Sequence, residues 1–270
     1  MTSDPMEGLP VWLINLPRAI ARREKMEAQL ATRGLPYTQF PGVDGRAEES
    51  RLLVNTNITA FERKMGHKIL IGGLGCYQPH LGVWSAFLAT EHTVALVLED
   101  DVVFHDDSLD AVRLALRATK HWDLLKLNRI RAKLSICQGK VGPYPLNAYV
   151  GPATGTDAYL LTRETAAKLL PAMRRVTCAT DHEINRFLIH DFRLRGLEPF
   201  PSHVEDRGQS LITGTEFADV RKHKGLAQLP YYLLKVANYL RRFWWLLKRG
   251  EMIPPARRLL ADPNSQTAGA

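Results

Sequence analysis

Residues 94–101 read VALVLEDD, an apolar run with the composition of a buried strand that ends in Glu99, Asp100 and Asp101. Burying an unpaired carboxylate is costly, so three acids at a strand end must face water, cations or a metal. Open α/β sheets bind ligands at the carboxyl ends of their strands, and Mg²⁺ commonly joins carboxylates to substrate phosphates. The stretch is therefore a candidate site for a metal-bound phosphorylated substrate. The alternative is a solvated acidic turn without a function, which is the commoner case for acid clusters in general.

The chain has 270 residues, 45% of them hydrophobic and 24% charged, which is typical of a globular protein with one large domain. Its three cysteines, Cys76, Cys137 and Cys178, are widely spaced and form no C-x-x-C pair. This pattern argues against a disulfide framework or a zinc site and favours a reducing cytoplasm. Residues 1–10 lack the pattern of a signal peptide, and no apolar run is long enough to span a bilayer.

The formal net charge of +8 is concentrated near the C-terminus. Residues 1–220 contain 26 Lys and Arg against 26 Asp and Glu, whereas residues 221–258 contain ten basic residues against Glu251 alone. This asymmetry predicts an anionic partner at one end of the protein.

The first forty residues predict a β–α–β unit, with a strand at 11–16, a helix at 18–33 and a strand at 36–40. Such a unit favours a parallel sheet covered by helices. Strands are also expected at 94–98, 122–127, 156–161 and 197–200, helices at 76–90, 108–120, 163–173 and 181–190, a glycine loop before residue 76, and a long loop or hairpin at 129–155. The alternation predicts an α/β fold with a mainly parallel central sheet.

Residues 229–250, LPYYLLKVANYLRRFWWLLKRG, predict a basic amphipathic helix. Its apolar side consists of Leu233, Val236, Ala237, Leu240, Phe243, Trp244 and Leu247, and its basic side of Lys235, Arg241, Arg242, Lys248 and Arg249. The interrupting charges exclude a membrane span. An aromatic and aliphatic face opposite a Lys/Arg face is typical of helices that lie in a membrane interface.

Three roles remain open for this helix. Binding to an anionic membrane surface is favoured because Trp244, Trp245 and the positive charge occur together. Alternatively, the helix packs its apolar side on the rest of the protein and leaves its basic residues in solvent. Nucleic-acid binding is the third role, and the neutral body argues against it because it offers no extended basic groove.

Six segments, in order along the chain, resemble the motifs of family 25 glycosyltransferases, which include bacterial lipooligosaccharide galactosyltransferases and, more distantly, collagen galactosyltransferases. The segments are VWLINLPR at 11–18, FPGVDG at 40–45, GCYQPHL at 75–81, LVLEDDV at 96–102, GTDAYLL at 155–161 and TDHEI at 180–184. Each motif alone is weak, whereas six in the family's order are specific. The sequence departs from the family at Pro79, where serine is usual, and at 182–185, where an apolar pair is usual.

The resemblance implies a GT-A-like fold, a nucleotide-sugar-binding α/β sandwich, at residues 11–225. A flexible N-terminus at 1–10 precedes this domain, and the basic amphipathic helix with a disordered tail follows it at 226–270. The implied activity is inverting transfer of a hexose, foremost galactose from UDP-galactose, to a lipopolysaccharide or lipooligosaccharide core. The expected partners are a nucleotide-sugar donor, a glycolipid acceptor and an anionic membrane surface, with no nucleic acid. The expected location is the cytoplasm, peripheral to the inner face of the membrane.

The implied cofactor is a divalent cation, Mn²⁺ or Mg²⁺, because charge accumulates on the diphosphate as the sugar departs. Glu99 and Asp101, two apart on one side of an extended segment, are the candidate metal ligands, with Asp101 foremost. Asp100 points the other way, towards a donor hydroxyl or a neighbouring amide. Inverting transfer also needs a general base, for which Asp181 is the first candidate and Glu183 the second. The alternative for Asp181 is a helix N-cap.

Further donor contacts are expected from five residues. Asn15, Arg18 and Arg22 lie where the first strand meets its helix, a place where phosphate binds readily and arginine can clamp it. A surface salt bridge is an equal alternative for Arg22. Asp44 could bind a ribose or a base, although an Asp-Gly turn is the common explanation. His80 either reaches the site or is a buried core histidine.

Two other classes of protein fit the same residues. A non-catalytic glycan- or nucleotide-binding module is compatible with the departures at Pro79 and His182, and it would not hydrolyse a donor in the presence of Mn²⁺. A metal-dependent phosphohydrolase built on the acidic strand end would release phosphate without transferring a sugar.

Overall fold

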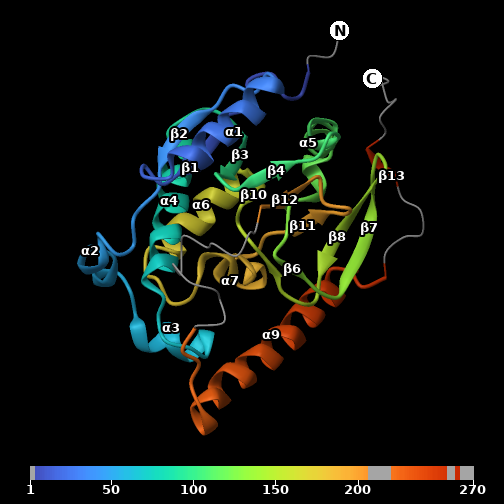
Figure 1. The fold of residues 1–270 in the computed structure, drawn as a ribbon. Coiled ribbons are helices and arrows are strands. Elements are labelled where there is room, and N and C mark those ends of the chain that lie inside the picture. The colour runs from blue at the N-terminus through green and yellow to red at the C-terminus, as the bar shows by residue number, and fades with distance from the viewer. Residues whose placement is uncertain (1–3, 206–219, 254–258, 262–270) are drawn as a thin grey trace.

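A nine-stranded sheet forms the centre of the protein, in the order β13-β7-β8-β11-β5-β10-β3-β1-β2 (Figure 1). The computed structural model describes residues 4–205, 220–253 and 259–261. The strands of this sheet are β1 (Val11–Asn15), β2 (Thr38–Pro41), β3 (Val94–Glu99), β5 (Leu124–Lys126), β7 (Ser135–Val141), β8 (Tyr144–Tyr149), β10 (Ala158–Thr162), β11 (Leu194–Leu197) and β13 (Leu259–Ala261). Two small separate sheets pair β4 (Val102–Phe104) with β12 (Ser202–Val204) and β6 (Arg131–Ala132) with β9 (Ala153–Thr154).

The β–α–β unit predicted for the first forty residues is confirmed. Strand β1 is parallel to β2 and to β3, and helix α1 (Ile20–Thr32) connects the first two strands. The predicted inward residues of this helix, Met26 and Leu30, are its two buried side chains.

The prediction of a mainly parallel sheet is wrong, because half of the neighbouring strand pairs are antiparallel. Strand β10 runs antiparallel to both of its neighbours, β3 and β5. The chain runs from β5 to β10 through the strands β6 to β9, without a helical crossover, and β10 therefore returns antiparallel to β5. Strand β10 therefore begins beside the end of β3, with Ala158 opposite Leu98.

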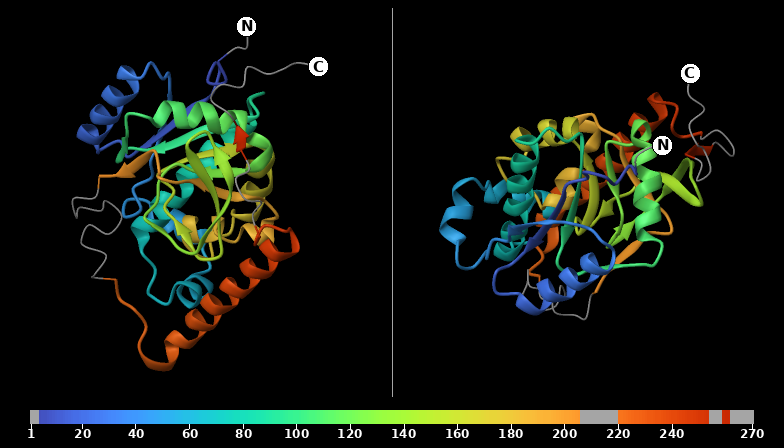
Figure 2. Two further views of the ribbon diagram at one scale, coloured as in Figure 1. Left: turned by 90° about the vertical axis from the view of Figure 1, so that its right-hand side faces the viewer. Right: turned by 90° about the horizontal axis from the view of Figure 1, so that it is seen from above.

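Helices cover both faces of the sheet (Figures 1 and 2). Besides α1 and the C-terminal helix, they are α2 (Glu49–Val54), α3 (Ile58–Met65), α4 (Ile71–Leu88), α5 (Ser108–Arg117), α6 (Arg163–Ala172), α7 (Thr180–Ile184) and α8 (Phe187–His190), with short 3-10 turns at Thr119–His121 and Gly225–Gln228. The side chains of β3 alternate between two cores. Ala95 and Val97 pack with α4 and α6, and Leu96 and Leu98 with α1 and α5. Burial on both faces explains why this strand is a continuous apolar run.

Helix α4 begins at Ile71, so the glycine loop expected before residue 76 is part of the helix. Gly45 and Gly75 allow the chain segment after β2 to approach it. A Cβ on Gly75 would lie 2.5 Å from the Val43 carbonyl oxygen, and one on Gly45 would lie 2.2 Å from the Ile71 carbonyl oxygen. Backbone contact this close holds residues 43–45 against the start of α4.

Helix α9 (Leu229–Lys248) lies along an outer edge of the body (Figures 1 and 2). No helix in the described ranges is long and apolar enough to cross a membrane. After α9, residues 259–261 form β13 beside β7, so this part of the tail is ordered where disorder was expected. The rest of that predicted tail, at 254–258 and 262–270, and residues 1–3 of the predicted flexible N-terminus lie outside the described residues.

Candidate active site

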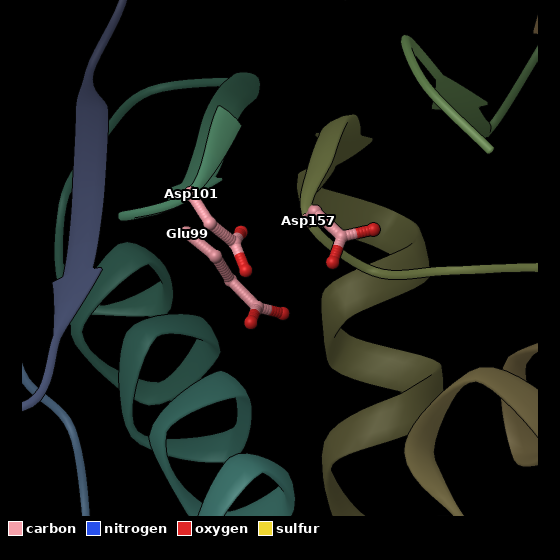
Figure 3. Close-up of side chains that lie close together, drawn as sticks. All are labelled: Glu99, Asp101 and Asp157. Carbon is pink, nitrogen blue, oxygen red and sulfur yellow. The ribbon is translucent and has the colours of Figure 1, made fainter. Parts of the chain in front are cut away.

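Three carboxylates converge at the edge of the sheet where β3 ends and β10 begins (Figure 3). Glu99 is the last residue of β3, Asp101 lies in the turn to β4, and Asp157 directly precedes β10. One oxygen of each carboxylate lies within 4.8 Å of the others. The antiparallel pairing sets this geometry, because the Glu99 backbone N–H donates to the Asp157 carbonyl oxygen at 2.7 Å.

The three carboxylates disfavour each other's charged forms. Burial is the main cause of the raised pKa values, which reach about 7 for Glu99, about 8 for Asp101 and about 7 for Asp157. Repulsion among the three groups adds to the effect, and Arg22 opposes it from 3.4 Å away from Asp101 Oδ2. Near neutral pH the cluster therefore holds protons or a cation.

The residues at this cluster fit a hard divalent cation. Asp101 Oδ1 and Asn128 Oδ1 are buried, and neither accepts a hydrogen bond within the described part of the chain. Asn128 follows β5, and its amide donates to Asp157 Oδ2 at 3.3 Å, so both orphaned oxygens lie on residues of one cluster. Carboxylate and amide oxygens are the ligands that Mg²⁺ and Mn²⁺ prefer.

His80 contacts the cluster through a hydrogen-bond chain whose direction can be assigned. The Trp84 indole can only donate, and it donates to the Tyr159 hydroxyl oxygen at 2.9 Å. The Tyr159 hydroxyl also lies 2.9 Å from His80 Nδ1, and it donates its proton there when a neutral His80 ring carries its own proton on Nε2. Burial lowers the pKa of His80 to about 4, so the ring is neutral and carries its proton on Nε2. His80 Nε2–H then donates to Glu99 Oε1 at 3.1 Å.

Glu99 Oε1 also accepts from the Thr156 hydroxyl at 3.2 Å. Two donors on one oxygen orient the carboxylate. His80 is thus both a buried core histidine and a residue in contact with the cluster, which unites the two alternatives that the sequence left open.

Asp100 is not one of the three carboxylates that converge at the sheet edge. Its Oδ2 accepts from the buried Asn15 amide at 2.6 Å, and its Oδ1 lies 3.5 Å from Arg22 Nη1. A neighbouring amide is one of the two partners expected for it. Asn15, Arg22 and the acidic strand end therefore form one connected group.

Arg18 and Asp44 form a more exposed pair, with Arg18 Nε 2.8 Å from Asp44 Oδ2. Asp44 Oδ1 accepts from the backbone N–H groups of Arg46 and Ala47, which is the local turn expected after an Asp-Gly pair. The pair lies next to the Asn15 end of β1, where the Gly42 backbone N–H donates to the Asn15 carbonyl oxygen at 2.7 Å.

Asp181 lies beside the cluster, in the first turn of α7. Its Oδ2 accepts from the Gly155 N–H at 3.3 Å, and its charge interacts with those of Glu99, Asp157 and Lys126. The N-cap of α7 is Ala179, so Asp181 is not the capping residue that was the alternative. Its carboxylate is therefore placed at the same sheet edge as the three converging acids.

Glu183 is held in a separate set of contacts. Its carboxylate lies 2.7 Å from Arg186 Nη1 and 3.1 Å from His190 Nε2, and it accepts from the Cys178 thiol at 3.0 Å. Although burial opposes it, these bonds lower the pKa of Glu183 to about 2. The side chain is committed to linking α7 with α8, and the structure does not bring it into the carboxylate cluster.

The sequence that forms this site is similar to a known protein family. The model of glycosyltransferase family 25, described as an LPS biosynthesis protein family, matches residues 9–184. The chain belongs to glycosyltransferase family 25. The matched region includes all three converging carboxylates, His80 and Asp181.

Three curated relatives of this family 25 chain differ in their assigned activity. A Drosophila melanogaster glycosyltransferase 25 family member is 29% identical over 173 residues, covering 60% of this chain and 28% of the relative. Procollagen galactosyltransferase 1 of Danio rerio is 26% identical over 250 residues, covering 81% and 40%. A Mus musculus protein named inactive glycosyltransferase 25 family member 3 is 28% identical over 168 residues, covering 59% and 28%. The chain spans less than half the length of these relatives.

Reasoning from the sequence missed several residues in or near the group of three carboxylates, among them Asp157, Asn128, Lys126 and Cys76. Asp157, Asn128 and Lys126 reach the site from strands whose order in the sheet the sequence does not reveal. Burial, and after it the negative charges of Glu99 and Asp101, raise the pKa of the Cys76 thiol on α4. A signal was available for two of them, because Asp157 lies within the GTDAYLL segment and Cys76 within the GCYQPHL segment, and both segments resemble family motifs.

Proposed function

We propose that this chain transfers a sugar from a nucleotide-diphosphate donor to a hydroxyl group of a glycan acceptor, with the help of a divalent cation. The observation that carries the proposal is the convergence of Glu99, Asp101 and Asp157. Within the described residues, Asp101 Oδ1 and the neighbouring Asn128 Oδ1 are buried and accept no hydrogen bond. A cation bound by all three carboxylates would offset the repulsion and the burial that raise their pKa values. Membership of family 25 supports a sugar as the transferred group.

The cluster would hold the cation through Glu99, Asp101 and Asp157, with the Asn128 amide oxygen as a further donor. A bound cation would neutralise the negative charge that develops on the leaving diphosphate. His80 and Thr156 keep one Glu99 oxygen engaged, so the other oxygen stays available to the cluster. Arg22 adds a positive charge beside Asp100 and Asp101, at the edge where a diphosphate would lie.

Asp181 is the proposed general base. An acceptor hydroxyl attacks the anomeric carbon as its proton leaves, so a base is needed within hydrogen-bond reach of the acceptor. The hydrogen bond from Gly155 holds Asp181 Oδ2 beside Asp157 without neutralising it. The buried Lys126 ammonium bonds the Gly155 carbonyl oxygen, so Asp181 and Lys126 fix the two sides of one glycine. Glu183 stays a second candidate only if Asp181 is dispensable.

Several finer features belong to the same proposal. The donor is UDP-galactose, the reaction inverts the anomeric configuration, the domain at 11–225 has a GT-A-like fold, and Arg18 and Asp44 contact the donor. The acceptor is a lipopolysaccharide or lipooligosaccharide core, reached from a peripheral position at the inner, cytoplasmic face of a membrane. The galactosyltransferase names of relatives support the sugar, and the description of the family supports the acceptor.

The test incubates the purified chain with a panel of UDP-sugars, an isolated lipopolysaccharide core and Mn²⁺, and measures both sugar transfer and UDP release. Transfer from UDP-galactose that requires the cation is expected. Asp101→Asn should abolish transfer, whereas Asp106→Asn, which removes an exposed charge at the start of α5, should not. Donor binding without any UDP release would identify a binding module, and phosphate release without sugar transfer would identify a phosphohydrolase.

Asp181→Asn separates catalysis from binding. The amide can still accept the Gly155 hydrogen bond, so UDP and Mn²⁺ binding should be unchanged. Transfer should fall by about 10²–10⁴-fold, the usual contribution of a general base. Unchanged transfer in this variant would remove Asp181 from the mechanism.

A further inference from the structure

Helix α9 presents its apolar residues away from the protein. We define the outer face as Leu229, Tyr232, Leu233, Val236, Leu240, Phe243, Trp244 and Leu247, which are between 36% and 61% exposed. The sequence predicted seven residues for the apolar side of the helix, and six of them belong to this outer face. The remaining one, Ala237, is half-buried. No residue in the ranges 4–205, 220–253 and 259–261 covers this outer face.

The opposite side of α9 contacts the body. Leu246 is buried with Ala148 and Val150, and the Trp245 ring packs against Phe187 with 5.1 Å between ring centroids. Near the other end of the helix, Tyr231 packs on Gly66 at the end of α3. These contacts are spaced along the whole helix, so they set its rotation about its own axis.

Arg242, which the sequence assigns to the basic side of the helix, lies on this inner side. The alternative that leaves the basic residues in solvent is therefore wrong for Arg242. Its side chain is buried, and its Nε donates to the Asn185 carbonyl oxygen at 3.2 Å. A helix that buries an arginine while exposing leucine, phenylalanine and tryptophan reverses the usual distribution of polarity. A contiguous apolar surface of this kind marks an interaction site.

The flanks of the outer face are basic. Lys235 lies on one flank, and Arg241 and Lys248 lie on the other; all three side chains are exposed. Lys222 and Lys224 precede the helix and are also exposed. The sequence contains no Asp or Glu from 220 to 250, so nothing in this segment offsets the charge.

We infer that the outer face of α9 docks on an anionic lipid bilayer, with the helix axis in the plane of the interface. Aromatic and aliphatic side chains would enter the acyl boundary, while the flanking ammonium and guanidinium groups would meet anionic headgroups. The inner contacts with α3, α8 and β8 would keep the body on the aqueous side. A second copy of the chain fits less well, because it would bring the same basic flanks together.

This inference is independent of the proposed catalysis, because binding to vesicles requires neither donor nor cation cluster. The test measures co-sedimentation of the full chain with phosphatidylcholine vesicles and with vesicles that also contain phosphatidylglycerol. Binding is expected only to the anionic vesicles. Charge reversal by Arg241→Glu with Lys248→Glu should weaken it about tenfold or more, as loss of headgroup attraction requires.

The apolar contribution is tested with Leu240→Gln combined with Trp244→Gln. Both residues are exposed, so the thermal midpoint should match that of the wild type while vesicle binding is lost. Val54→Gln, which changes an 80% exposed valine on α2, is the matched control and should bind as the wild type does. Equal binding by the outer-face variant would overturn the inference. So would absence of wild-type binding, or a dimer in sedimentation velocity that the outer-face variant dissociates.

Discussion

His80 Nε2 donates to Glu99 Oε1 across 3.1 Å, from a ring whose other nitrogen accepts the proton of Tyr159. All the donors in this chain point one way, from Trp84 through Tyr159 and His80 to Glu99. This chain of hydrogen bonds thus links buried core residues to Glu99, one of the three carboxylates. A change deep in this hydrogen-bond chain should therefore alter cation binding at the sheet edge.

Tyr159→Phe removes the hydroxyl between Trp84 and His80. Two buried groups lose their partner, so the free energy of unfolding should fall by about 1–3 kcal/mol. The His80 proton is then no longer directed to Nε2, and Mn²⁺ binding should weaken. Urea unfolding and calorimetric titration measure the two effects.

Tyr77→Phe is the matched control for that variant. The Tyr77 hydroxyl is also buried, but it donates to the Met173 carbonyl oxygen at 3.0 Å and contacts no carboxylate of the cluster. It should lose stability and keep its cation affinity. The hydrogen-bond chain would have no functional role if both variants bound Mn²⁺ equally well.

The stability of the metal-free protein should decrease as pH rises. Glu99, Asp101 and Asp157 titrate at about 7, 8 and 7 in the folded protein, above their ordinary values. The folded state therefore holds protons that the unfolded chain releases at lower pH. This contribution to stability is fully present below the unfolded pKa values and is lost as pH rises through the folded ones.

A bound cation should reverse this trend, because it replaces the protons. The thermal midpoint, measured at about pH 6 and about pH 8.5 with and without Mg²⁺, tests both statements. The Mg²⁺-induced rise should be larger at the higher pH. An equal rise at both values would mean that the cation does not compete with protons at this cluster.

Gly155→Ala should damage the site more than the fold. Gly155 has φ +98°, which a side chain disfavours, and a Cβ there would lie 2.9 Å from Asp157 Oδ2. The carboxylate must move, so Mn²⁺ affinity and sugar transfer should both fall. Gly34→Ala is the control, because it introduces a methyl group at φ +62° with no heavy atom within 4 Å. It should reduce stability and leave Mn²⁺ affinity and sugar transfer unchanged. Equal transfer by the two variants would contradict the placement of Asp157.

Glu183→Gln tests the second candidate base. Removing this charge leaves Arg186 without its buried carboxylate, and breaking such a pair costs about 3–5 kcal/mol. The thermal midpoint should therefore fall. Transfer per folded molecule at low temperature should stay close to that of the wild type. A normal midpoint with abolished transfer would instead assign Glu183 to the reaction.

Local features of this fold could be predicted from the sequence. The apolar run before Glu99 indicated a buried strand, which the structure has at Val94–Glu99. The start of α4 was not predictable from propensity. Its glycines read as a loop, whereas packing against the chain around Gly45 makes them helical.

Features that depend on strand order could not be predicted. Asp157 and Asn128 are far from Glu99 along the chain, and only the antiparallel entry of β10 beside β3 brings them together. For α9, the helical wheel separated apolar from basic residues. It did not show which side meets the body, because contacts such as Arg242 with Asn185 arise only in the folded protein.

The central claim is that Glu99, Asp101 and Asp157 hold one divalent cation. Calorimetric titration of Mn²⁺ into the full chain in the presence of UDP tests it most directly, with Asp157→Asn and Asp106→Asn measured alongside. One Mn²⁺ per chain is expected for the wild type and for Asp106→Asn, and none for Asp157→Asn. Wild-type affinity and stoichiometry in Asp157→Asn would contradict this claim.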